Sequence, residues 1–142
     1  MAKSVIEFSG DFGGRDAAAV VLPHFRALKA AAEGVEFAGF PFARLGFVLR
    51  VDGEVTQFRP TGLSNPEMDR GRECFALDIG IAFSDRAHLR TACSEAIRAS
   101  YDFIIAALAG ARIGRVDEVA LKRALELVAE RYLRASVEIG RS

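Results

Sequence analysis

The stretch 72–83, RECFALDIGIAF, constrains the fold most, because from Cys74 onward its side chains alternate strictly between small and large. Every second position carries a large apolar side chain: Phe75, Leu77, Ile79, Ile81 and Phe83. The positions between them are smaller, and one of them is charged, Asp78. A period of two is typical of a β-strand that buries only one of its faces. We therefore predict a strand here, in a sheet with one covered face.

A second β-rich stretch, 42–59, contains Asp52-Gly53 between two runs of strand-forming residues. Asp-Gly in this position is typical of a hairpin turn, so we predict two adjacent antiparallel strands. Alternation divides the first of them into two faces, with Leu45, Phe47, Leu49 and Val51 on one side and Arg44, Val48 and Arg50 on the other.

The N-terminal part predicts a strand followed by a helix. Residues 3–8, KSVIEF, have β character and lead into the glycine-rich stretch 10–15, GDFGGR. Apolar residues recur at helical spacing over 16–33, and Gly34 is placed to end the helix. Pro23 leaves two interpretations open: it kinks this helix, or it begins the helix and the residues before it are extended.

The C-terminal part predicts two more helices. The first starts at Ser84 or Asp85 and continues to Gly110. The second begins after Asp117, which we predict as its N-cap. Its buried stripe is predicted to be Leu121, Leu125, Val128 and Tyr132.

The predicted order is therefore β-α-β-β-β-α-α, which indicates an α+β fold. We expect an antiparallel sheet of about four strands, covered on one face by about three helices. A length of 142 residues is typical of one domain, so we predict a single α+β domain over residues 1–142. Hydrophobic residues make up 51% and charged residues 27%, a composition that excludes wholesale disorder.

Charge and hydropathy narrow the expected partners and location. The 19 basic and 19 acidic residues cancel, which removes the positive charge that nucleic-acid binding needs, so no direct nucleic-acid partner is predicted. The N-terminus, MAKSVIEFSGD, lacks the apolar core of a signal peptide, and the longest apolar runs are too short for a membrane span. We expect a cytoplasmic protein without a membrane partner.

Few residues suggest catalysis. Cys74 with His24 or His88 is the available thiol and base, but no recognised signature surrounds them, and a packed thiol explains Cys74. Ser84 and Asp85 with His88 have the composition of a triad, which an N-cap and a surface histidine also explain. No metal-binding spacing such as H-x-x-x-H or C-x-x-C occurs. We predict no enzyme, no metal and no cofactor.

Two other candidates have simple structural explanations. The stretch GDFGGR follows a strand and precedes a helix, where backbone N–H groups can hold a phosphate, but Asp11 and Asp16 would repel an anion, so a plain turn is favoured. Asp78 lies among small residues on the uncovered side of its strand. We expect it to form a cross-strand ion pair with Arg44 or Arg50.

The stretch 59–74, RPTGLSNPEMDRGREC, has no periodicity and is longer than the usual hairpin loop. Long loops of this kind are often functional, and its mixture of charges suits contact with a protein better than a small-molecule pocket. The residues predicted to contact a partner are Glu67, Asp69, Arg72 and Glu73.

Over residues 42–137, the hairpin around Asp52-Gly53, the strand ECFALDIGIAF and the two closing helices resemble the build of small bacterial immunity proteins from contact-dependent inhibition and related toxin systems. The likeness is one of build and not of motif. It implies a non-enzymatic protein that binds a cognate toxin domain and blocks its active site. Many such nuclease inhibitors are acidic, whereas this chain is neutral, so the chemistry of the toxin is left open.

Two other classes of function compete with this interpretation. One is an enzyme or small-ligand carrier with a pocket between the sheet and the helices, to which Tyr101 or Asp78 would supply a polar group. The other is a self-associating subunit, a homodimer formed through the exposed sheet face or a helix.

Overall fold

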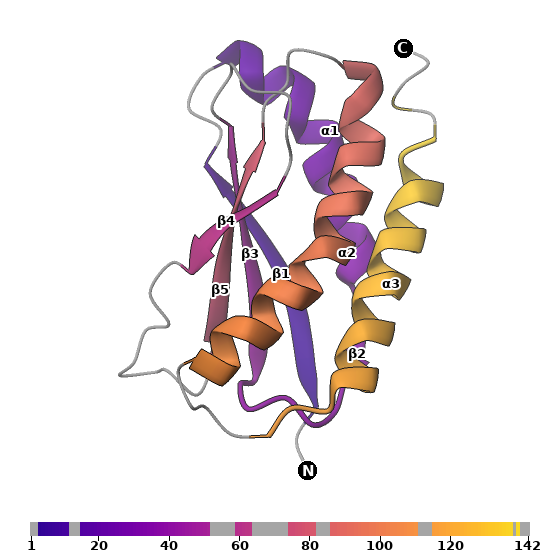
Figure 1. Ribbon diagram of the computed structural model, residues 1–142. Coiled ribbons are helices and arrows are strands. Elements are labelled where there is room, and N and C mark those ends of the chain that lie inside the picture. The colour runs from indigo at the N-terminus through magenta and orange to yellow at the C-terminus, as the bar shows by residue number, and fades with distance from the viewer. Residues whose placement is uncertain are drawn as a thin grey trace.

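The computed structural model describes residues 3–11, 15–51, 59–63, 74–81, 86–110, 115–137 and 139. The elements are, in chain order, β1 (Ser4–Asp11), α1 (Arg15–Ala32), β2 (Glu36–Phe37), β3 (Arg44–Val51), β4 (Arg59–Leu63), β5 (Cys74–Ile81), α2 (Arg86–Gly110) and α3 (Glu118–Ala135). Figure 1 shows the described helices grouped on one side of the sheet. The fold is α+β, as predicted. None of the helices within these ranges is long and apolar enough to cross a membrane.

The sheet is mixed, so the prediction of an antiparallel sheet is wrong. Its strand order is β2-β1-β3-β5-β4, in which β1, β3 and β5 run parallel and β2 and β4 run antiparallel to their neighbours. The parallel arrangement of β1 and β3 arises because α1 carries the chain back across the sheet before β3 begins. The two-residue strand β2 is an addition to the predicted order.

The predicted hairpin around Asp52-Gly53 is also wrong. Both edges of β3 are occupied along its length, one by β1 and the other by β5. The next strand along the chain, β4, pairs with the far edge of β5 instead. A local turn signal does not specify which strands become neighbours, since that choice depends on the long-range pairings available. Residues 52–58 lie outside the described ranges.

The stretch 59–74, predicted as a connection, begins with an edge strand. Residues Arg59–Leu63 form β4, whose register with β5 shifts between Pro60 and Gly62. An edge strand tolerates Pro60 because the missing N–H need not face a neighbour. The predicted partner-binding residues, Glu67, Asp69, Arg72 and Glu73, lie outside the described ranges.

The predicted core face of β3 and β5 is confirmed at the side chains that the structure describes, whereas the predicted core residues Val51, Ile81 and Phe83 lie outside that set. The side chains that alternate toward the helices are buried, and they are Ile6 and Phe8 of β1, Leu45, Phe47 and Leu49 of β3, and Phe75, Leu77 and Ile79 of β5. Phe8 and Phe47 stack with their ring centroids 5.2 Å apart. The helices therefore cover one face of three parallel strands.

The helix boundaries follow the sequence signals closely. Helix α1 continues through Pro23, which excludes the alternative of a separate extended piece before it. Gly34, with a φ of 76°, follows the end of α1 as predicted, since a positive φ suits a residue without a Cβ. Helix α2 ends at the predicted Gly110. Its predicted start at residues 84 and 85 lies outside the described ranges.

Helix α3 packs against α1 and α2, and its first turn is bonded to the loop before β3. Its predicted N-cap is confirmed, because Asp117 Oδ1 accepts a hydrogen bond of 3.0 Å from the backbone N–H of Ala120. The Asp117 N–H donates to the carbonyl of Gly39 at 2.7 Å, which anchors the start of α3 to the loop between β2 and β3. The predicted stripe is buried at Leu121, Leu125, Val128 and Tyr132.

Candidate functional site

The face of the sheet opposite the helices carries small and charged side chains. Two successive rows across β1, β3 and β5 are Glu7, Gly46 and Ala76, then Ser9, Val48 and Asp78. Their side chains point away from the helices because their neighbours along each strand point toward the core. We call the surface formed by Glu7, Arg44, Gly46, Val48, Arg50, Ala76 and Asp78 the open face.

Two ion pairs cross the strands of the open face. Arg50 Nε lies 3.2 Å from Asp78 Oδ2, which confirms the predicted ion pair and identifies Arg50 as the partner. Arg44 lies nearer β1, with its Nη1 3.8 Å from Glu7 Oε2. The side chains of Arg44, Glu7 and Arg50 are about half exposed, at 52%, 53% and 50%. The exposed Arg44–Glu7 pair contributes about 0–1 kcal/mol to stability, so its charges stay available for binding, whereas in the other pair Asp78 is only 21% exposed and Arg50 is the more accessible partner.

A second group of polar residues, the polar cluster, lies buried between the three described helices. It consists of His24 on α1, Cys93 on α2 and Tyr132 on α3. His24 Nδ1 lies 2.7 Å from the Tyr132 hydroxyl, and residues of α1 and α3 are thereby joined across 108 positions of sequence. The polar cluster therefore holds the helices together.

Burial keeps each member of the polar cluster uncharged at neutral pH. It lowers the pKa of His24, and it raises the pKa of Cys93 to about 12 against the opposing effect of a hydrogen bond with Tyr132. Burial also raises the pKa of Tyr132, and interaction with Cys93 adds to that rise. A neutral imidazole can accept the phenolic proton, but a thiol with so high a pKa is a poor nucleophile. We therefore interpret the polar cluster as a structural contact between the helices.

The end of α3 is tied to α2 by Arg90. Its Nε donates to Ser136 Oγ at 3.0 Å and to the carbonyl of Leu133 at 3.2 Å. Ser136 in turn donates its backbone N–H to the Tyr132 carbonyl at 2.9 Å. These bonds satisfy carbonyls that a helix C-terminus otherwise leaves without partners. Arg90 therefore holds the last turn of α3, which contains Tyr132, against α2.

Among the residues considered for catalysis, His24 is the one whose side chain the structure describes. His24 points into the helix interface, and its Nδ1 is engaged with Tyr132. Cys74 begins β5 and His88 lies in the first turn of α2, but their side chains are outside the described set, as are Ser84 and Asp85 altogether. The stretch GDFGGR does join β1 to α1, as predicted, although residues 12–14 are not described.

The two residues considered for a pocket lie apart. Asp78 belongs to the open face, whereas Tyr101 lies on α2 with the Lys122 ammonium 5.6 Å from its ring centroid. Among the described residues, no group of three histidine, cysteine, aspartate or glutamate side chains is placed to hold a metal ion.

Sequence reasoning missed Glu7 as a member of the open face. Its position in the alternation of β1 is visible, since Ile6 and Phe8 on either side are apolar. What the sequence does not reveal is that β1 lies beside β3, which brings Glu7 within reach of Arg44.

Comparison with protein-family models, with curated proteins and with solved structures gave no match.

The lowered pKa of His24 predicts a decrease in stability in mild acid. As pH falls below the ordinary value of 6.5, the unfolded chain takes up a proton that folded His24 resists, so the free energy of unfolding decreases. We expect His24 to contribute a loss of at most about 1.4 kcal/mol of unfolding free energy per pH unit over the range just below pH 6.5. Urea denaturation of the parent and of His24→Gln across this range will measure it. The variant should be less stable at pH 7.5 but less sensitive to acid, and equal pH slopes would contradict the prediction.

Proposed function

We propose that this protein is an immunity-type inhibitor, which binds a cognate bacterial toxin domain in the cytoplasm and blocks it by contact. The observation that supports this proposal is the open face. Three strands present four charged side chains around small residues on a side of the sheet that no described helix covers.

The chemistry of the open face suits a protein partner. Its charges are paired within the face, yet Arg44 and Arg50 are about half exposed and can take new partners at low cost. Gly46 and Ala76, between these charges, carry no large side chain. The expected partner surface carries acidic groups opposite Arg44 and Arg50, since charge complementarity sets both the specificity and the rate of association.

The predicted contact residues of the stretch 64–73 extend this proposal. Glu73 is bonded to Cys74, and Cys74 pairs with Arg44 across β5 and β3. We propose that Glu67, Asp69, Arg72 and Glu73 contribute to the same binding surface.

Co-expression with the toxin domain encoded by the neighbouring open reading frame tests this function. The parent protein should restore bacterial growth and co-purify with the toxin domain. Replacing both arginines of the open face, Arg44→Glu with Arg50→Glu, should weaken binding about 10- to 100-fold, mostly through slower association, and abolish protection. Surface plasmon resonance at two salt concentrations will measure the association rate.

A matched control reverses two exposed arginines on the helical side, Arg26→Glu on α1 with Arg123→Glu on α3. This variant has the same change of net charge and should protect growth as the parent does. Both double variants should retain the parent's melting temperature within a few degrees. Full protection by the variant of the open face, or no complex with the toxin domain, would contradict the proposal.

A further inference from the structure

The two edges of the sheet differ in how open they are to another strand. On the β4 edge, Pro60 and the register shift beside Gly62 interrupt the regular backbone pattern, a usual protection against pairing with another chain. On the β1 edge, β2 pairs only with Ser4 and Val5. From Ile6 onward, β1 has no outer neighbour among the described strands.

The backbone of β1 faces this free edge in an alternating pattern. Val5 donates its N–H to the carbonyl of Ala43, on the β3 side, at 3.0 Å. In a parallel pair, every second residue directs both its N–H and its C=O toward the same neighbour, so Glu7 and Ser9 also face β3. Ile6, Phe8 and Gly10 therefore direct their N–H and C=O groups outward, where they need partners.

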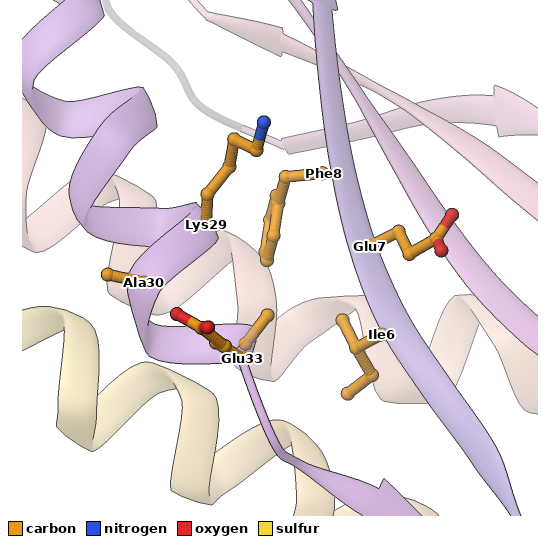
Figure 2. A pocket seen from close by; sticks show the side chains of 7 residues that line it. Ile6, Glu7, Phe8, Lys29, Ala30 and Glu33 are labelled. Atoms are coloured by element: carbon orange, nitrogen blue, oxygen red, sulfur yellow. The ribbon is translucent and has the colours of Figure 1, made fainter.

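A groove of about 570 Å³ runs along this edge, between β1 and the C-terminal half of α1. Its wall is apolar at Ile6 and Phe8, and Lys29 and Glu33 stand on the helix side. Figure 2 shows Lys29 beside Phe8, and Glu33 one helical turn further on, at the level of Ile6 but with its carboxylate turned away from β1. Glu7, by contrast, points away from the helix.

We infer that this groove binds an extended segment of another polypeptide, which adds to the sheet antiparallel to β1. Such a strand would satisfy the outward N–H and C=O groups of Ile6 and Phe8, the mode of binding known as β-augmentation. Its alternate side chains would enter the groove, where their methylene groups pack on the apolar wall. This groove shares β1 and Glu7 with the open face but lies on the edge and helix side of that strand, and the inference does not depend on the proposed function.

The two charges of the groove specify the segment further. A residue opposite Phe8 lies near Lys29 and is favoured when acidic. Glu33 lines the groove at the level of Ile6, so a long basic side chain opposite Ile6 is favoured there. An antiparallel strand passes Phe8 before Ile6. The acidic residue therefore precedes the basic residue by two positions.

A second copy of this chain fits the groove less well. A two-fold axis that pairs the outward-facing Phe8 with its own copy would place the two Lys29 side chains on the same side of the joined sheet, close to the axis. Like charges at that place oppose association. The charge pattern therefore favours a different polypeptide.

Amide hydrogen exchange followed by NMR tests whether the edge is free. In the protein alone, the amides of Ile6, Phe8 and Gly10 should exchange at least tenfold faster than those of Glu7 and Ser9. The probe is the acetylated and amidated peptide Thr-Val-Glu-Val-Lys, which ends opposite Ile6 and so avoids β2, added at up to millimolar concentration. It should produce saturable shift changes at the Ile6 and Phe8 amides and slow their exchange. Equal protection of all five amides without peptide, or peptide shifts confined to other elements, would overturn the inference.

A charge exchange tests the specificity. The variant Lys29→Glu with Glu33→Lys should bind this peptide about two- to thirtyfold more weakly and prefer a peptide in which Glu and Lys are interchanged. The control Arg123→Glu, on α3 outside the groove, should bind both peptides as the parent does. Indifference of all three proteins to the order of Glu and Lys would refute the proposed charge selection. Growth protection by the Arg44→Glu, Arg50→Glu variant tests binding at the open face only. Its outcome does not bear on peptide binding in the groove.

Discussion

Replacement of Tyr132 by alanine is expected to lower the free energy of unfolding by about 3–5 kcal/mol. The ring is fully buried among α1, α2 and α3, and its truncation leaves a cavity where the three described helices meet. The same change removes the hydroxyl that lies 2.7 Å from His24 Nδ1. Urea denaturation at pH 7.5 will measure the loss.

The variant Tyr132→Phe separates the hydroxyl from the ring. It keeps the packing but leaves His24 Nδ1 without this partner in a buried site, so we expect a loss of about 1–3 kcal/mol. The matched control is Tyr101→Phe, the half-buried tyrosine of α2, which should change stability by no more than about 0.5 kcal/mol. Equal effects of the two tyrosine-to-phenylalanine changes would show that the polar cluster contributes nothing through its hydrogen bond.

Gly39→Ala is expected to be the second most damaging change, at about 2–5 kcal/mol. Gly39 has a φ of 78°, a conformation that costs any residue with a Cβ, and its added methyl group would overlap the Cβ of Asp117. The backbone there must move, which breaks the bond between the Asp117 N–H and the Gly39 carbonyl and loosens the start of α3.

Gly34→Ala supplies the control for Gly39. Gly34 has nearly the same φ, 76°, but an added Cβ meets no atom within 4 Å. The change Gly34→Ala should therefore lower the free energy of unfolding only by the conformational strain, about 1–2 kcal/mol. The difference between the two variants in thermal and urea denaturation measures the steric overlap with Asp117. If the two losses are equal, the loop at Gly39 moves aside without cost and the contact with α3 is unimportant.

The part of the candidate site that depends only on strand alternation was predictable from the sequence. Asp78 stands among small residues in a strongly alternating strand, so its place on the uncovered face and its pairing with an arginine followed from the sequence. The pairing of Glu7 with Arg44 did not follow, because it requires β1 beside β3. The contact of His24 with Tyr132 did not follow either, since two helices far apart in sequence must first meet.

The groove beside β1 also depends on tertiary structure. Nothing local in SVIEFSGD indicates that β2 stops after pairing with Ser4 and Val5, or that α1 stands next to the exposed edge. The proline in β4 and the absence of proline in β1 are visible in the sequence. Only the strand order shows that β4 and β1 lie at edges of the sheet, where a proline hinders pairing with another strand and its absence permits it.

The sequence alone determined which side chains are buried in β3, β5 and α3, and where α1 and α2 end. These properties depend on the repeat of the backbone, two residues in a strand and 3.6 in a helix, and on residues that cap a helix locally. Tertiary structure alone decided that β1, β3 and β5 run parallel and that β3 has no hairpin partner. Strand neighbours are chosen among competing long-range pairings, and here the crossover through α1 and the packing of three helices on one face decided between them.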